Sequence, residues 1–427
     1  MNSRERITAS LRHQPTDKIA VDFAGSRQSG IAAIAYAKLK KHLGITTGDI
    51  YVYDMMQQLA IVEPEILDIF DVDCIELGRA FLLQPDDWRD WELPDGTPCK
   101  IPAYVNLERK RDAWYIVSSD GRELGYQPPD CLYFEQTYFP FETKTVGEVD
   151  LLDELPRGMA DHMRVAAQAP GRHFPLDEHG LRKLSDAAKT LHDSTDRAIL
   201  GVFGGNMFEL PQCLFRMDRY FMDMGLDPDG IIALSERICE LHLQLLNKWL
   251  PAVKDCIDIV GVADDLGGQH KPLMSPAMYR KYYKPYHARI WRRIKEIAPH
   301  VRISMHCCGA VASLLDDLID AGLDAINPVQ ITCEGMSAEN LMAKFGGRIV
   351  FCGGGCDTRD ILPNGTPEQI REHVLGQLRH FAPRTADGMF TGGFIFQQVH
   401  NIQANVPPEN IVTMFETVRE YSEKLSK

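Results

Sequence analysis

A histidine and two cysteines follow a short apolar run in the stretch "VRISMHCCGAV", residues 301–311. In an extended strand, positions i and i+2 face the same side, so His306 and Cys308 share one face. Imidazole nitrogen and thiolate sulfur are ligands that zinc binds tetrahedrally. The pair is therefore half of a candidate zinc site. The competing interpretation is a core histidine with satisfied hydrogen bonds beside a small, buried cysteine.

A further cysteine favours the metal interpretation. In "FCGGGCDT" three glycines separate Cys352 from Cys356, and glycines allow the backbone to approach a ligand closely. We expect Cys356 to be the third metal ligand and Cys352 to pack inside its apolar run. A phosphate-binding loop is a weaker alternative, because the glycines lack the spacing of the nucleotide fingerprints and no Lys-Ser or Lys-Thr follows them.

The composition restricts the partners and the compartment. The 60 acidic residues against 46 Lys plus Arg give a net charge of −14, which repels nucleic acids and anionic membrane surfaces. No stretch reaches the roughly 18 consecutive apolar residues of a membrane-spanning helix, and the charged N-terminal segment is unlike a secretory peptide. We therefore expect a cytoplasmic protein whose 11 cysteines stay reduced and available to a metal.

The elements that must position these residues alternate along the chain. Short apolar runs alternate with longer amphipathic segments, which predicts repeated β/α units around a parallel sheet. Eight such units predict an α/β fold in which a single TIM (β/α)8 barrel domain spans residues 1–427. Asp-Gly turn signals between β-prone runs predict a hairpin-rich insertion over residues 81–150. The predicted strands lie at residues 18–25, 72–78, 197–204, 256–265, 301–308, 323–330, 348–355 and 389–398.

Helix signals lie between the later strands. Residues 275–298 predict a long amphipathic helix that begins with Ser275 as N-cap and Pro276 in the first turn. Residues 313–322 and 366–382 predict two more helices, and a glycine, Gly322, is expected to end the first of them.

In a closed β/α barrel, catalytic side chains come from the carboxyl ends of the strands. Period-two alternation turns His306 and Cys308 toward the barrel mouth and the apolar residues of their strand toward the helices. In the preceding strand the same rule favours Asp265 as the inward carboxylate and Asp264 as a hydrogen-bond brace. His400 follows the last strand, where a structural turn and a substrate-binding role both remain open.

The order of these motifs resembles the uroporphyrinogen decarboxylase superfamily. The resemblance runs from about residue 195 to the end, and the opening "RERITASLRHQPTDKIAVDF" is similar to the start of that family. It implies a TIM barrel. The stretches that carry the resemblance are "ADDLGGQHKPLMSPAMYRKYYKPYH", "MHCCGAV", "DAINPVQ", "CDTRDILPNGTPEQIREHV" and "VHNIQANVPPENI".

Two branches of that superfamily differ in chemistry. The decarboxylases carry an arginine-rich loop after the first strand that binds the carboxylates of a tetrapyrrole, whereas "DFAGSRQSGI" keeps only Arg27. The cobalamin-dependent methyltransferases hold zinc through a His-x-Cys motif, which His306 and Cys308 match, and a later cysteine. In coenzyme M methyltransferases that cysteine lies in the final strand, where "TGGFIFQQ" has none. Cys356 is therefore our inference and is not carried over from the family.

The resemblance implies a zinc-dependent methyltransferase of the O-demethylase type. It would move a methyl group between a small methylated substrate, such as a methoxylated compound, and the cobalt of a corrinoid (cobalamin) carried by a partner protein. Asp265 and His400 are the expected catalytic residues, with Asp265 as a fourth ligand or a brace. A metal-free decarboxylase, a non-catalytic binding barrel and a homodimer stay open. The expected substrate-binding residues are Arg27, Gln269, Asn327, Gln330 and Asn401.

Overall fold

The computed structural model describes residues 1–129, 131–148, 151–163 and 174–423. Its central element is an 8-stranded sheet with the strand order β1-β16-β15-β14-β13-β12-β11-β4, in which every neighbouring pair is parallel. A parallel bridge between Asp22 and Cys74 joins the two ends of this order. The sheet therefore closes into the predicted barrel, and each predicted strand segment contributes to it. The strands are β1 (Ala20–Val21), β4 (Cys74–Glu76), β11 (Ala198–Gly204), β12 (Ile259–Ala263), β13 (Arg302–His306), β14 (Ala325–Asn327), β15 (Val350–Cys352) and β16 (Phe394–Phe396).

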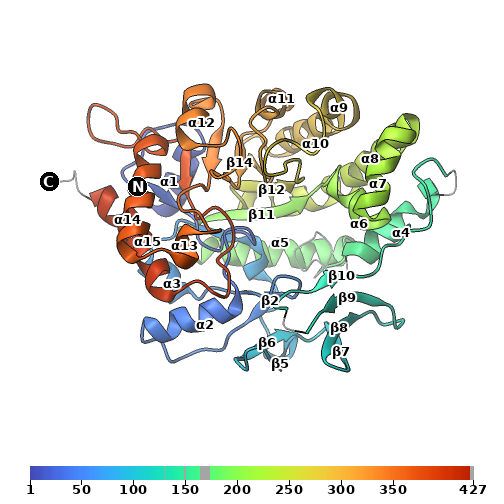
Figure 1. The fold of residues 1–427 in the computed structure, drawn as a ribbon, viewed down its shortest axis with the longest axis horizontal. Helices are drawn as coiled ribbons and strands as arrows, with labels where there is room; N and C mark the ends of the chain where they lie inside the picture. The colour runs from blue at the N-terminus through green and yellow to red at the C-terminus, as the bar shows by residue number, and fades with distance from the viewer. Residues whose placement is uncertain (130, 149–150, 164–173, 424–427) are drawn as a thin grey trace.

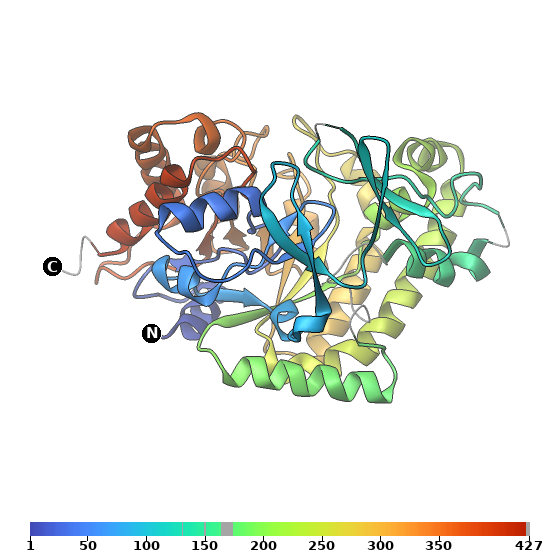
Figure 2. The same cartoon turned by 90° about the horizontal axis from the view of Figure 1, so that it is seen from below.

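Helices surround the barrel, with the long α5 and α8 running along its outside (Figures 1 and 2). Short 3-10 turns at Leu77–Ala80, Pro85–Asp87 and Lys254–Cys256 complete the helical segments. The α-helices are α1 (Ser3–Ser10), α2 (Ala33–His42), α3 (Pro64–Ile69), α4 (Leu151–Met163), α5 (Glu178–Asp193), α6 (Glu209–Phe215), α7 (Met217–Leu226), α8 (Pro228–Val253), α9 (Pro276–Tyr282), α10 (Lys284–Ile297), α11 (Leu315–Ala321), α12 (Ala338–Phe345), α13 (Ile361–Asn364), α14 (Pro367–Phe381) and α15 (Pro408–Glu423).

The ends of these helices follow the predicted signals in two places and depart from them in one. Ser275 caps α9 by accepting the N–H of Met278 at 3.2 Å, and Gly322 ends α11 in the left-handed conformation with φ 110°. The stretch 275–298 is broken at Tyr283, which has φ −131°. Pro285 explains the break, because a proline inside a helix has no N–H to donate and clashes with the preceding turn.

The two faces of the barrel strands separate as period-two alternation predicts. The outward side chains of β13, Ile303 and Met305, are buried in the large core under the helices. The inward side chains form a smaller apolar cluster of their own, which Ile7 and Leu11 of the N-terminal segment also join. The strand residues of this inner cluster are Ala20, Cys74, Ala198, Leu200, Ile259, Ala325, Val350, Cys352 and Ile395.

Within the insertion predicted for residues 81–150, the described residues form antiparallel hairpins, which project beside the barrel in Figure 1. It contacts loops at the carboxyl end of the barrel: Gln136 Nε2 donates to the carbonyl of Cys213 in α6 at 2.8 Å, and the Tyr133 hydroxyl donates to Gln403. The insertion therefore borders the barrel mouth. Its strands are β5 (Trp88–Glu92), β6 (Pro98–Pro102), β7 (Asn106–Lys110), β8 (Ala113–Val117), β9 (Glu123–Gln127) and β10 (Glu135–Gln136); a separate small hairpin is formed by β2 (Val52–Asp54) and β3 (Leu59–Ala60).

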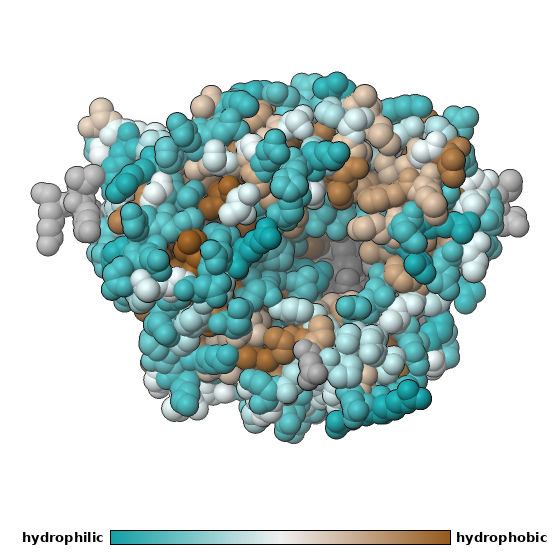
Figure 3. All heavy atoms as spheres, viewed as in Figure 1, coloured by the Kyte–Doolittle hydropathy of each residue, from teal (hydrophilic) through white to brown (hydrophobic). Residues whose placement is uncertain are grey.

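The surface in Figure 3 is dominated by hydrophilic side chains, in keeping with the net charge of −14. Within the described residues, none of the helices combines the length and the hydropathy that a membrane span requires.

Candidate metal centre

Three potential metal ligands converge at the carboxyl end of the barrel. His306 ends β13, Cys308 follows it, and His400 lies in the loop after β16. One ligand atom of each residue lies within 4.8 Å of the others. The Sγ of Cys308 is 3.4 Å from Nε2 of His306, and the two imidazole rings meet edge to face with centroids 5.7 Å apart.

Asp265 borders this group. One of its carboxylate oxygens accepts the backbone N–H of Cys308 at 2.7 Å, and the same oxygen lies 3.4 Å from Nε2 of His306. The carboxylate thus fixes the backbone that carries Cys308 and lies beside the His306 ring.

A buried chain of amide hydrogen bonds orients His306 from behind. The Nδ1 atom of His306 lies 3.0 Å from Oδ1 of Asn327, its neighbour in the sheet register. Asn327 Nδ2 donates to Gln397 Oε1 at 2.6 Å, and Gln397 Nε2 donates to Asp22 at 2.7 Å. An Asn327 oxygen that faces the ring requires a proton on Nδ1, which leaves Nε2 free to bind a metal.

The electrostatics of the group suit a cation. Burial and the negative charge of Asp265 raise the pKa of the Cys308 thiol, so the thiolate needs a positive partner to form. Burial and the neighbouring His306 lower the pKa of His400 to about 4. His400 is therefore neutral at physiological pH, which is the form that coordinates metals.

Two further acidic residues, Asp264 and Glu209, lie near the same end of the barrel. Asp264 is fully buried and points away from the group, where it accepts the N–H groups of Met207, Phe208 and Glu209 at the start of α6 and contacts His287 at 2.9 Å. It is thus the predicted brace. Burial, followed by the charges of Asp265 and Asp264, raises the pKa of Glu209 to about 8.

Comparison with known proteins identifies the family. The sequence model described as "Uroporphyrinogen decarboxylase (URO-D)" matches residues 151–421. This chain belongs to the uroporphyrinogen decarboxylase family. The resemblance seen in the sequence motifs is thereby confirmed.

Relatives of this family member include curated uroporphyrinogen decarboxylases. That of Geotalea uraniireducens (strain Rf4) is 25% identical over 341 residues, which cover 76% of this chain and 92% of the relative. That of Pelobacter propionicus is 26% identical over 268 residues, which cover 61% of this chain and 72% of the relative. A solved structure, a methyltransferase from Methanosarcina mazei, matches with a TM-score of 0.57 and 16% identity over 99% of both chains. At that identity the match shows a shared fold.

The structure does not bring Cys356 to the metal-ligand group of this uroporphyrinogen decarboxylase family member. Cys356 is completely buried in the outer core, and its Sγ lies 3.9 Å from the carbonyl of Asp357. Gly353 and Gly354 have φ of 106° and 80°, so the glycines serve a turn that carries the cysteine under the helices. Cys352 faces the barrel interior within the inner apolar cluster.

The predicted substrate-binding residues take several places around the mouth. Arg27 pairs with Asp54 at 2.5 Å, and its charge acts on His400. Gln269 accepts a hydrogen bond from Arg359 at 3.3 Å, and Gln330 accepts the N–H of Gly309 at 2.5 Å. These contacts join the loops next to Cys308.

Asn401 is buried and engaged on both sides. Its amide donates to Gln57 and accepts from Gln403 at 2.5 Å. Two of the predicted binding residues contact metal-ligand candidates: Asn327 contacts His306, and the side chain of Asn401 hydrogen-bonds to His400.

Asp22, Gln397 and Glu209 were missed by sequence reasoning. The signal for the first two was present, since Ala20 and Ile395 are interior residues two positions earlier, and alternation turns Asp22 and Gln397 to the same face. Glu209 had no such signal, because it lies beyond the end of β11, at the start of α6.

Proposed function

We propose that this protein is a zinc-dependent methyltransferase that moves a methyl group between a small methylated substrate, such as a methoxylated compound, and the cobalt of a corrinoid protein. The observation that carries the proposal is the convergence of His306, Cys308 and His400 within 4.8 Å. The solved methyltransferase with the same fold supports it.

The donor set suits zinc. One sulfur and two imidazole nitrogens form a set that zinc binds in tetrahedral sites, with the fourth position left for substrate or a carboxylate. We propose His306, Cys308 and His400 as ligands, with Asp265 as fourth ligand or brace. When bound, zinc supplies Lewis acidity to the ether oxygen or thiol of the substrate.

The protein side chains would orient the reactants around this site. Asn327 holds the His306 ring by its Nδ1 atom, and Asp265 holds the Cys308 backbone. Arg27, Gln269 and Gln330 are proposed to line the path of the substrate, because they border the same mouth. The corrinoid is proposed to arrive on a partner protein.

The metal content of the purified protein tests the proposal. Anaerobically purified wild type should contain about one zinc per chain, as a single tetrahedral site would. Cys308→Ala should lose that zinc and should fail to methylate a corrinoid protein in the presence of methoxylated substrates. Full zinc occupancy in this variant would contradict the ligand assignment. Cys239→Ala, which removes a buried cysteine of the outer core, controls for loss of a thiol.

A metal-free decarboxylase is a second candidate, favoured by the names of the curated relatives. In that reaction positioned charges would stabilise a developing carbanion. Arg27 already pairs with Asp54, so this protein is poorly equipped for a substrate with many carboxylates. Coproporphyrinogen formation from uroporphyrinogen by zinc-free protein would favour this candidate over methyl transfer.

A further inference from the structure

His400 and Asn401 lie between two main-chain anchors in the loop after β16. Before them, the N–H of Val399 donates to a carbonyl of the loop after β15 at 2.8 Å. After them, the N–H of Ile402 donates to a carbonyl of the loop after β1 at 2.9 Å. Within the described residues, no hydrogen bond between main-chain groups involves His400 or Asn401 themselves. Side-chain contacts therefore hold this part of the metal-ligand group.

The side chain of Asn401 makes these contacts. Asn401 is buried beside its neighbour in the chain, His400, and hydrogen-bonds to it. Its Nδ2 donates to Oε1 of Gln57, and its Oδ1 accepts from Nε2 of Gln403 at 2.5 Å. Both ends of the amide are thus occupied, so its position depends on both partners.

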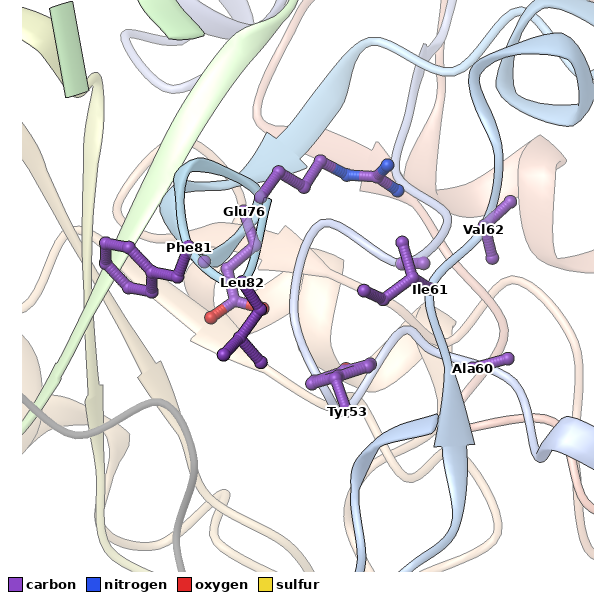
Figure 4. A pocket seen from close by; sticks show the side chains of 10 residues that line it. Tyr53, Ala60, Ile61, Val62, Glu76, Phe81 and Leu82 are labelled. Atoms are coloured by element: carbon purple, nitrogen blue, oxygen red, sulfur yellow. The ribbon is translucent and has the colours of Figure 1, made fainter. Parts of the chain in front are cut away.

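The first partner, Gln57, comes from the small hairpin. It lies in the turn between β2 and β3, whose residues Tyr53 and Ala60 are labelled in Figure 4. The N–H of Gln57 donates to the buried carboxylate of Asp54 at 2.9 Å, and that carboxylate pairs with Arg27. The small hairpin therefore fixes one end of the Asn401 amide.

The second partner, Gln403, depends on the hairpin insertion. Its Nε2 also donates to the carbonyl of Asn401 at 3.2 Å. A carbonyl can only accept a hydrogen bond, so Gln403 turns its nitrogen to Asn401 and its oxygen away. That oxygen accepts from the hydroxyl of Tyr133, which lies 270 positions earlier in the chain. Without this hydroxyl, one end of the Gln403 amide would lose its donor.

The hydroxyl of Tyr133 stands on a well-anchored part of the insertion. The next residue, Phe134, is buried, and its N–H donates to the carbonyl of Met56 in the small hairpin at 3.0 Å. Glu135 then pairs with Tyr126 in the antiparallel register of β10 and β9. Tyr133 itself is half-buried, as suits a side chain with an apolar ring and one polar end.

We propose that Tyr133 is a positioning residue for His400. Through Gln403 and Asn401, its hydroxyl holds the His400 imidazole over the barrel mouth. The consequence for a metal rests on the proposed function, whereas the position of the ring does not. The ring centroids of His306 and His400 are 5.7 Å apart, so a rotation of either side chain would separate their nitrogens. The hairpin insertion is thus part of the support of the metal-ligand group.

A nuclear Overhauser effect (NOE) between the two imidazole rings tests the position without metal or turnover. In metal-free, deuterated wild type with protonated histidines, His306 and His400 should show this NOE. Tyr133→Phe removes one hydroxyl and keeps the ring, and it should lose most of the NOE. Tyr115→Phe, which removes a hydroxyl from β8 of the same insertion, is the matched control and should keep it.

Zinc affinity tests the consequence for the metal. Direct partners of metal-binding histidines change affinity by about 10- to 100-fold, and Tyr133 acts from further away, so Tyr133→Phe should weaken zinc binding by about threefold to tenfold. Tyr115→Phe should bind zinc as wild type does. Gln403→Met, which has a similar length but no amide, should lose as much as Tyr133→Phe. The double variant should lose no more than either single variant, because both changes break the same chain of hydrogen bonds.

The outcomes of the two experiments separate the possible failures. An unchanged NOE in folded Tyr133→Phe would overturn the proposal. Additive zinc losses in the double variant would also overturn it, because the hydroxyl would then not act through Gln403. If wild type binds no zinc, the proposed function fails, and the NOE comparison still decides whether Tyr133 positions His400.

Discussion

His400 and Cys356 are rival candidates for the third position of the metal-ligand group. His400 lies within 4.8 Å of His306 and Cys308, whereas Cys356 is completely buried in the outer core. A zinc left with two protein ligands must fill the remaining positions with water, at a large cost in affinity.

We therefore expect His400→Ala to lose at least tenfold in zinc affinity and Cys356→Ser to keep zinc close to the wild-type level. Cys356→Ser should instead lower the free energy of unfolding by about 1–3 kcal/mol, because it buries a hydroxyl in an apolar site. Zinc competition with a chromophoric chelator and urea unfolding measure the two quantities. The reverse order of zinc losses would restore Cys356 as the ligand.

Asp22 determines which ring nitrogen of His306 carries the proton, and it acts through Gln397 and Asn327. Its carboxylate accepts from Gln397, and the chain of amides then presents the oxygen of Asn327 to Nδ1 of His306. Asp22→Asn would place an amide donor against the Gln397 donor. This would favour flipping of the Gln397 and Asn327 amides, so that the hydrogen bonds run in the opposite direction and Asn327 donates to His306. The proton of His306 would then move to Nε2 and compete with the metal.

For Asp22→Asn we expect a 10- to 100-fold loss of zinc affinity, as for other partners of metal-binding histidines. The ¹⁵N chemical shifts of His306 in metal-free protein should show the tautomer change, which a general loss of structure would not produce. Asp258→Asn, at a carboxylate near the amino end of β12 that accepts the N–H of Ile199, is the control and should leave the tautomer unchanged.

At the scale of elements, the start of helix α6, which follows β11, contains a group whose ionisation should make the stability depend on pH. Asp264 anchors the first N–H groups of α6, and Glu209, the first residue of that helix, has a pKa raised to about 8. Its ordinary value is about 4.3. Between these two values the folded protein binds a proton that the unfolded chain has lost, so stability falls as the pH rises.

In metal-free protein, Glu209 should therefore contribute a decrease in the free energy of unfolding as the pH rises from about 4.5 to 8, with a slope of at most about 1.4 kcal/mol per pH unit. Glu209→Gln removes the titrating group and should flatten the decrease. Urea unfolding of both proteins at several pH values measures the difference. Parallel curves for the two proteins would show that Glu209 does not carry the proton.

At the scale of the whole molecule, helix α1 closes the amino end of the barrel. Ile7 is fully buried and Leu11 nearly so, and both belong to the cluster inside the strands. Arg6 anchors the helix by pairing with Asp17 at 2.9 Å and with Asp73. The N-terminal segment is thus part of the barrel core.

Ile7→Ala should lower the free energy of unfolding by about 2–5 kcal/mol, since the cavity would lie in a closed space with little room to collapse. The matched control is Ile69→Ala on α3, whose side chain is 36% exposed and whose loss should cost about 0.5 kcal/mol or less. Denaturant unfolding compares the two variants. Equal effects would show that α1 contributes little to closure.

Local patterns were sufficient to predict the barrel, the hairpin insertion and the shared face of His306 and Cys308, whose Nε2 and Sγ atoms lie 3.4 Å apart. The period of two along a strand follows from covalent geometry and needs no knowledge of distant residues. Alternation could also have identified Asp22 and Gln397, which we missed, because each lies two positions beyond an interior residue, Ala20 or Ile395. The local pattern therefore contained the residues that orient His306 through hydrogen bonds, although only His306 belonged to a recognisable chemical motif.

Only the tertiary structure decided which distant side chain lies beside that motif. Cys356 and His400 follow the neighbouring strands β15 and β16, and no local period distinguishes them. A Cβ at Gly355 would stand 2.2 Å from the Phe396 ring, so close packing against β16 sets the path of the loop and buries Cys356, while the loop after β16 places His400 over the mouth. The direction of such loops depends on contacts that form between residues far apart in the chain once the barrel has closed, and these contacts leave no local pattern.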